Sequence, residues 1–143
     1  MIYCKKGESV FVTETVFDDE TGLPTRQLTT LNGVLQSPPN DTPARVVFDD
    51  LGRICEMAWY SAGQEHRDLS KGPAVVEINP DNGICISERF KIKGNTSRSR
   101  SEPALLIRNE ETGDLIGTAY YLDGVEIAAP KPATCQAALV PKP

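Results

Sequence analysis

His66 is the only histidine of the chain and the first side chain to consider for chemistry. Its imidazole could accept a proton near neutral pH, and together with a turn carboxylate it could serve a hydrolase. A Ser-His-Asp triad or a multi-histidine metal site would need a further base or ligand. A structural role is the better interpretation, because His66 and Arg67 follow Gly63 as a loop signature that could hydrogen-bond to a carboxylate of an adjacent turn. Arg98 stands at the same distance from Gly94 and is expected to act in the same way.

Acidic residues gather where turns are expected. They are Asp18, Asp19, Glu20, Asp49, Asp50, Glu110 and Glu111. Paired carboxylates could work as acid and base or bind Ca²⁺, but Asp also favours turn geometry on a solvated rim. A catalytic pair is needed only once in a protein. The recurrence of acidic pairs at corresponding turns therefore favours turn geometry on a solvated rim over catalysis. We therefore expect a protein that is not an enzyme and that uses no metal or cofactor.

The chain has four cysteines and no CxxC pair: Cys4, Cys55, Cys85 and Cys135. Zinc sites and thioredoxin-like motifs need closer spacing, so the cysteines are expected to be reduced. Cys55 and Cys85 fall in predicted strands, which favours small buried side chains over reactive thiols.

A period of about 30 residues organises the segments that carry these side chains. Pro-Ala pairs recur at this interval: Pro43-Ala44, Pro73-Ala74 and Pro103-Ala104. Each pair precedes a short run of β-forming residues and a turn that closes on a glycine: Gly52, Gly83 or Gly113. An aromatic residue follows seven residues later: Trp59, Phe90 or Tyr120. Another glycine comes four residues after that: Gly63, Gly94 or Gly124.

Within each unit the apolar residues alternate with a period of two, which is typical of strands with one buried face. The predicted fold class is all-β, a meandering antiparallel sheet of stacked β-hairpin repeats with Trp59, Phe90 and Tyr120 in one apolar row. We expect one domain over 1–143, with units at about 33–62, 63–93 and 94–123. A degenerate N-terminal cap covers about 7–32, with Thr29 in place of the aromatic. A Pro-rich C-terminal cap covers 128–143, with a helical turn at 134–139.

The second unit carries a longer motif, Trp59 to Arg67 followed by Gly72-Pro73-Ala74. This segment resembles the WYxxGxxHRxxGPA repeat of bacterial, phage and giant-virus proteins, which is similar to MORN repeats and to MORN-like antitoxin-type repeat proteins. The resemblance covers roughly residues 31–127. It implies a ladder of β-hairpins with a binding or scaffolding role, and it adds no catalytic residue. Other units depart from the motif, with Ser97-Arg98 or Gln36-Ser37 where the second has His-Arg.

A second aromatic directly follows two of the aromatic positions. Since consecutive residues of a strand point to opposite faces, a core of Trp59 and Tyr120 would place Tyr60 and Tyr121 on the other face, with Lys91 between them. A Tyr, Lys, Tyr stripe has the composition of interface cores, although a second buried face or an amphipathic cover would also explain it. The candidate binding residues are Tyr60, Lys91, Tyr121, His66, Arg67 and Arg98.

Charge is unevenly distributed along a chain of net charge −5. Five bases and no acid lie between Arg89 and Arg100: Arg89, Lys91, Lys93, Arg98 and Arg100. This segment could bind an anion or a membrane surface, but the net charge opposes nucleic acid as a partner. A protein partner is favoured, and a second copy of the chain is an option because an open array leaves sheet edges to pair.

The sequence shows no apolar run near the length of a membrane span, and Met1 leads into Lys5 and Lys6 without an apolar signal segment. We expect a cytoplasmic, non-enzymatic protein-interaction module or scaffold.

Overall fold

The computed structural model describes residues 10–131, and within them every regular element is a β-strand. The predicted all-β, meandering antiparallel sheet is confirmed. The helical turn expected at 134–139 lies outside the described residues. The strands are β1 (Phe11–Phe17), β2 (Pro24–Leu31), β3 (Val34–Leu35), β4 (Arg45–Phe48), β5 (Ile54–Ala58), β6 (Tyr60–Ser61), β7 (Gln64–Glu65), β8 (Val75–Ile78), β9 (Cys85–Arg89), β10 (Lys91–Ile92), β11 (Asn95–Thr96), β12 (Leu105–Arg108), β13 (Leu115–Leu122) and β14 (Val125–Ile127).

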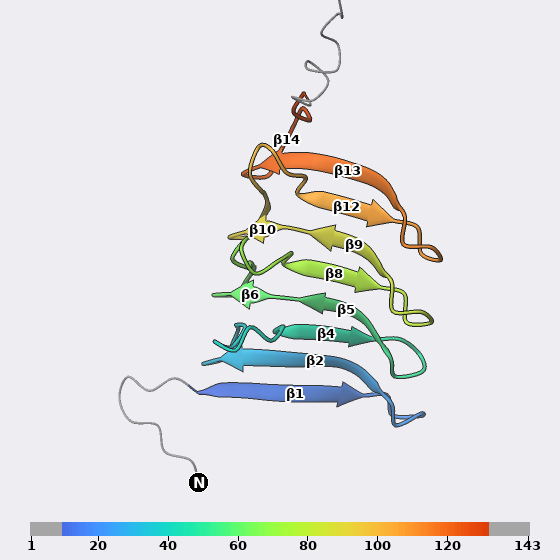
Figure 1. Ribbon diagram of the computed structural model, residues 1–143. Coiled ribbons are helices and arrows are strands. Elements are labelled where there is room, and N and C mark those ends of the chain that lie inside the picture. Colours follow the sequence, from blue (N-terminus) through green and yellow to red (C-terminus); the bar gives the residue numbers. More distant parts are fainter. Residues whose placement is uncertain (1–9, 132–143) are drawn as a thin grey trace, which may run out of the picture.

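The main sheet has ten strands and follows the chain in the order β1-β2-β4-β5-β8-β9-β12-β13-β14, with β3 paired to β2. Figure 1 shows these strands rising one above another as an open sheet, with the longer turns at one end. Short hairpins project from the opposite end, two of them as separate pairs, β6-β7 and β10-β11. Nothing in residues 10–131 forms a helix that could cross a membrane.

Asx turns close the hairpins at the longer-turn end. Asp18, Asp49, Asn79 and Asn109 each accept hydrogen bonds from later backbone N–H groups through Oδ1. The turn at Asp49 is one residue shorter than the others, yet the ladder restarts two residues beyond the glycine in every case. The register is therefore set from the glycine side of the turn, as the constant glycine-to-aromatic spacing predicts. Asp18 and Asp49, two of the acids noted in the sequence, therefore serve turn geometry in the structure.

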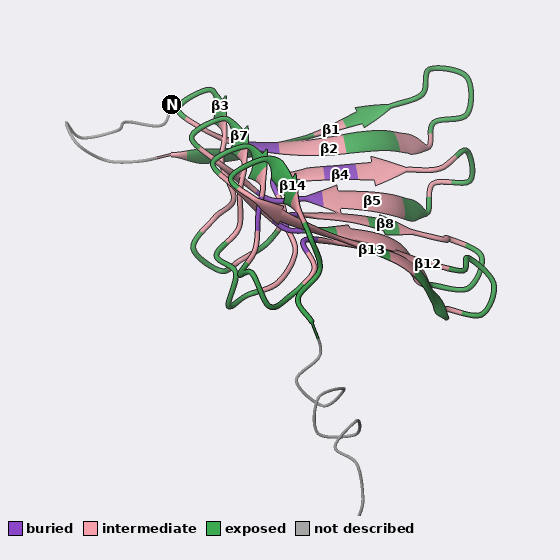
Figure 2. Ribbon diagram, turned by 90° about the horizontal axis from the view of Figure 1, so that it is seen from above, coloured by how far each residue is buried: buried purple, intermediate pink, exposed green. Residues whose placement is uncertain are grey.

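The core is a narrow column at the short-hairpin end, where the connecting loops fold back against the sheet (Figure 2). Its buried members, Thr29, Ala44, Val46, Ala58, Trp59, Ala74, Phe90, Ser97 and Ala104, are at most 7% exposed. The backbone N–H groups of Thr29, Trp59 and Phe90 each donate to the carbonyl of the next Pro-Ala alanine, at 2.7, 2.7 and 2.8 Å. Trp59 and Phe90 thus lie in the predicted row with Thr29, while Tyr120 at its end is half-buried.

Beyond this column the sheet is a single layer. The registers place Val46 opposite Met57 and Val76 opposite Glu88 on the face that carries the aromatic column. The other face carries ion pairs such as Arg45 with Glu56, whose N and O atoms are 2.6 Å apart. A single layer buries little apolar area, so most of the packing energy must come from the column.

Substitution of the adjacent residues Trp59 and Tyr60 tests whether the packing energy comes mainly from the buried column. Trp59 is 6% exposed and Tyr60 is half-buried. Trp59→Ala should lower the free energy of unfolding by about 3 to 5 kcal/mol, and Tyr60→Ala should lower it by less than half as much. Urea unfolding followed by circular dichroism measures both. Equal and small losses would contradict the assignment of the two faces.

Candidate functional site

The short hairpins turn at two-residue tips in which both residues have positive φ. The tips are Asn32-Gly33, Ala62-Gly63, Lys93-Gly94 and Asp123-Gly124, with φ near 50° at the first residue and 81–85° at the glycine. These are the angles of a type I′ turn, which suits the twist of a tight hairpin. Ala62 and Lys93 are unusual there, because a left-handed conformation is unfavourable for side chains of their type.

Each of the three later tips docks onto the short hairpin that precedes it in the chain. The N–H groups of Gly63, Gly94 and Gly124 donate to the carbonyls of Leu35, Glu65 and Thr96, at 3.0, 2.9 and 2.9 Å. The second free N–H of each of these three tips, on the residue before the glycine, is bound by a side chain. Ala62 N donates to Gln36 Oε1 at 2.7 Å, Lys93 N to His66 Nδ1 at 2.9 Å, and Asp123 N to Ser97 Oγ at 3.0 Å.

His66 is therefore a backbone acceptor in the structure. Its Nδ1 atom receives the Lys93 N–H, which assigns the proton of the neutral ring to Nε2. The expected carboxylate partner is not what the structure shows: no hydrogen bond joins His66 to a carboxylate among the described residues. Gln36 and Ser97 lie at the same offset from their tip glycines. They accept the corresponding backbone N–H with an amide oxygen and a hydroxyl oxygen.

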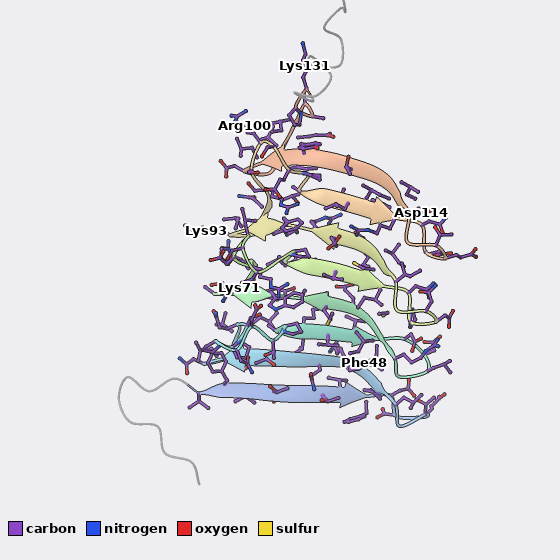
Figure 3. The ribbon with its side chains drawn as sticks, in the orientation of Figure 1. Phe48, Lys71, Lys93, Arg100, Asp114 and Lys131 are labelled. Atoms are coloured by element: carbon purple, nitrogen blue, oxygen red, sulfur yellow. The ribbon has the colours of Figure 1, made fainter. Side chains whose placement is uncertain are left out.

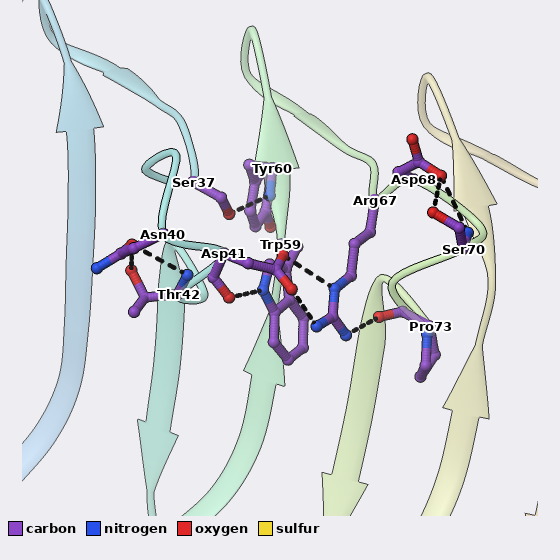
Figure 4. Close-up of polar contacts among 10 residues, drawn as sticks. All are labelled: Ser37, Asn40, Asp41, Thr42, Trp59, Tyr60, Arg67, Asp68, Ser70 and Pro73. Carbon is purple, nitrogen blue, oxygen red and sulfur yellow. Dashed lines mark hydrogen bonds and ion pairs between the residues drawn. The ribbon is translucent and has the colours of Figure 1, made fainter.

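Arg67 lies flat on Trp59, with its guanidinium carbon 3.8 Å from the ring centroid. Its Nε and Nη2 atoms donate to the two carboxylate oxygens of Asp41 at 3.2 and 2.7 Å, and Nη1 donates to the Pro73 carbonyl at 3.1 Å (Figure 4). Trp59 Nε1 donates to the Asp41 carbonyl at 2.9 Å. Asp41 provides the kind of partner expected for Arg67, a carboxylate, although it lies in the loop before β4 and is not one of the turn acids noted in the sequence. Hydrogen bonding to Arg67 holds the pKa of Asp41 below its usual range.

Arg98 repeats the stack on Phe90, also at 3.8 Å from the ring centroid. Its Nη1 donates to the Pro103 carbonyl at 3.1 Å, and its Nη2 pairs with Glu102 of its own loop at 2.7 Å. The two arginines thus cover the two large buried rings in place of a second layer. Each is engaged by a carboxylate and a carbonyl.

Gly72 allows Arg67 to pass close to the chain. A Cβ atom at this position would lie 2.9 Å from Arg67 Nη1, and the φ of +133° suits glycine alone.

A shallow hollow of about 230 Å³ opens beside this arginine. It is lined by Gln36, Asp41, Trp59, Tyr60, His66 and Arg67, among others. Three of the six candidate binding residues, Tyr60, His66 and Arg67, therefore meet in one place. The backbone N–H of Tyr60 donates to Ser37 Oγ at 3.0 Å, and burial, followed by the charge of Glu65, raises the pKa of the Tyr60 phenol.

Tyr60, Lys91 and Tyr121 occupy corresponding positions of three successive hairpins. Their carbonyls accept from the N–H groups of the loop residues Ser37, Arg67 and Arg98, at 2.8, 3.3 and 3.1 Å. We call these three residues the hairpin stripe. All three are half-buried. Lys91 Nζ lies 2.5 Å from Glu65 Oε1, so the charge in the middle of the stripe is neutralised.

The basic segment Arg89–Arg100 does not form one patch. Lys91 and Arg98 are held by Glu65 and Glu102, and Lys93 and Arg100 lie exposed on different loops (Figure 3). Within residues 10–131 no three His, Cys, Asp or Glu side chains gather as a metal ion would need. Cys55 and Cys85 are free thiols, and burial raises the pKa of each, which disfavours the reactive thiolate.

The type I′ tips are the feature that sequence reasoning missed. Two of the four carry a recognised signal, Asn32-Gly33 and Asp123-Gly124. Ala62-Gly63 and Lys93-Gly94 carry none apart from their equivalent spacing. Comparison of the chain with models of protein families, with curated proteins and with solved structures found no match.

Substitution of His66 tests its role as an acceptor. His66→Ala leaves the Lys93 N–H without a protein partner and should lower the free energy of unfolding by about 1 kcal/mol. His66→Gln should recover most of that loss, because Gln36 supports the neighbouring tip with an amide oxygen. Chemical denaturation of the three proteins checks this. An equal loss in both variants would contradict the acceptor role.

The pH dependence of stability tests the Asp41 contact with Arg67. Because the pKa of Asp41 is lowered in the folded chain, its contribution to stability is present above the unfolded value of about 3.9 and is lost as pH falls through the folded pKa. The difference in unfolding free energy between wild type and Asp41→Asn should therefore be largest near neutral pH and shrink below about pH 4. Asn tolerates the φ of 65° at this position.

Asp50→Asn is the matched control for this measurement, since the exposed Asp50 carboxylate makes no hydrogen bond or ion pair with the described residues. A difference between wild type and Asp41→Asn that stays constant from neutral to acid pH would rule out the contact as a source of stability.

Proposed function

We propose that the chain is a non-catalytic, MORN-like β-repeat module that binds another protein through the hairpin stripe. The observation that carries this proposal is the placement of Tyr60, Lys91 and Tyr121 at one position of three hairpins joined by backbone hydrogen bonds. The recurrence of tips, arginine stacks and Pro-Ala contacts along the chain supports the repeat.

The dimensions of the stripe suit an extended peptide segment. Corresponding hairpins are two strands apart, so successive stripe residues should be about 9 to 10 Å apart and the whole stripe about 19 Å long. An extended segment of about six residues has that length. Two tyrosines provide large contact area with little loss of side-chain entropy, and a tyrosine hydroxyl can hydrogen-bond to the backbone of a partner.

The electrostatics favour a protein over an anionic surface. Glu65 neutralises Lys91 at the centre of the stripe, and Arg98 is paired with Glu102. The basic segment consequently offers less free positive charge than its five residues imply. The side chains that could have served catalysis are also engaged, with His66 Nδ1 bound to a backbone N–H and Arg67 bound to Asp41.

Affinity capture from the native host tests the stripe. Tyr60→Ser combined with Tyr121→Ser should abolish retention of a protein that the wild type retains, because the double variant removes both large contact surfaces. Lys93→Glu combined with Arg100→Glu is the matched control and should retain it. The opposite result, loss with the charge variant and retention with the tyrosine variant, would favour the anion or membrane-surface alternative.

Photocrosslinking locates the contact. A photoreactive phenylalanine analogue at position 121 should form a crosslink to the captured protein, and the same analogue at position 118, outside the stripe on β13, should not. Crosslinks from 118 alone would place the partner elsewhere on the sheet.

A further inference from the structure

Strand β1 forms one edge of the main sheet and pairs only with β2 among the described residues (Figure 1). It is seven residues long, and six of those residues are exposed. Edge strands of this kind are usually shortened, bulged, covered or charged, because their free backbone groups can pair with another chain. β1 runs through Phe11–Phe17 without a bulge of its own and carries one charge, Glu14.

The backbone groups that face outward from β1 follow from the hydrogen bonds of its neighbours. On the side of the second strand that faces β1, Asn32 N donates to Val10 O at 3.4 Å. On the opposite side of that strand, Thr29 N donates to Ala44 O at 2.7 Å. Even-numbered residues of β1 therefore pair with β2, since bonding alternates along an antiparallel strand. The outward N–H and C=O groups belong to the odd-numbered residues: Phe11, Thr13, Thr15 and Phe17.

The sequence of β1 reads the same in both directions, Phe-Val-Thr-Glu-Thr-Val-Phe, with Glu14 at its centre. A two-fold interface needs a surface that is complementary to itself. If two β1 strands meet antiparallel about an axis through Glu14, every residue faces its own kind in the second copy. The facing pairs are Phe11 with Phe17, Val12 with Val16, Thr13 with Thr15, and Glu14 with Glu14.

We propose that β1 is a homodimerisation edge, through which two copies of the chain join their sheets into one in this register. The proposal rests on the proposed function only in that the chain binds protein, and it uses a different surface from the hairpin stripe. The odd-numbered residues form the hydrogen-bonded pairs, with about eight bonds across the interface. Paired aromatic, β-branched and threonine side chains stabilise neighbouring strands further.

Glu14 sets the strength of this contact. As an even-numbered residue it takes a non-hydrogen-bonded position, where opposing Cα atoms lie only about 4.5 Å apart. Two like charges directly opposite each other destabilise the pairing. On its own sheet Glu14 faces Leu28, and the nearest base by register is Arg26, opposite Val16. The dimer of the unmodified chain is consequently weak, and its affinity responds to the charge at this one position.

Sedimentation velocity of wild type, Glu14→Lys and their equimolar mixture tests the register. The mixture should form a heterodimer at least about tenfold tighter than either homodimer, because the central pair becomes Glu with Lys. Glu14→Gln alone should also dimerise more tightly than wild type. Tyr60→Ser should leave the dimer unchanged, which separates this edge from the hairpin stripe.

A proline variant tests the edge itself. Thr13→Pro removes an outward N–H and spares the backbone bonds from β1 to β2, losing only the 2.9 Å hydroxyl contact with Thr29. In the Glu14→Gln background it should therefore abolish the dimer while the circular dichroism spectrum stays native. A mixture no tighter than its components would overturn the proposal, as would association that survives Thr13→Pro. Species that grow beyond dimers would instead indicate head-to-tail pairing of β1 with the opposite edge of the sheet, formed by β13 and β14, and would equally overturn it.

Discussion

The two free N–H groups at each hairpin tip are the constraint on which this end of the molecule depends. A type I′ turn closes its hairpin with other groups and leaves both central N–H groups unpaired. At Ala62-Gly63 the preceding hairpin provides the acceptors, Gln36 Oε1 and the Leu35 carbonyl. An isolated hairpin of this size would be marginal in water, so the stability of each tip depends on its neighbour. The left-handed backbone at Ala62 and Lys93 persists for the same reason.

The arginine stacks solve a second problem, which is how a single-layer sheet protects large rings. Trp59 and Phe90 have the sheet on one side and a loop on the other, and Arg67 and Arg98 close the gap with their planar guanidinium groups. Each arginine is then anchored to the carbonyl of the proline that opens the next strand. Ring, arginine and strand start are thereby fixed to one another in each unit. The alanine after each of these prolines is fully buried, because the backbone of the ring residue hydrogen-bonds to it directly.

Much of this architecture could be predicted from spacing, and the rest depends on contacts that spacing does not reveal. Period-two alternation and the interval from Gly52 to Trp59 were enough for the strands, the meander and the face of the rings. Among the short hairpins, Asn32-Gly33 and Asp123-Gly124 carried a usable signal. Ala62-Gly63 and Lys93-Gly94 could not be predicted, because Ala62 and Lys93 have no intrinsic preference for their backbone conformation. That conformation is imposed by the neighbouring hairpin.

The candidate site, too, could be predicted only in part, and the rest of it required the fold. A carboxylate partner for Arg67 was expected from charge chemistry, but its identity as Asp41, 26 residues earlier, required the fold. For His66 the expectation named the wrong kind of partner, because an imidazole can accept from a backbone N–H as readily as it can donate to a carboxylate. The sequence also places three different side chains, Gln36, His66 and Ser97, in one structural role, and only their shared ability to accept a hydrogen bond links them.

The docking of tips gives the stack a direction, with donors always toward the earlier hairpin and acceptors toward the later one. Position 127 is the next in the series of acceptor side chains, three residues beyond Gly124, and it holds isoleucine. A hydrocarbon side chain cannot receive an N–H, so a further tip could not be seated there as the others are. Ile127 therefore ends the series of acceptor side chains at the fourth hairpin.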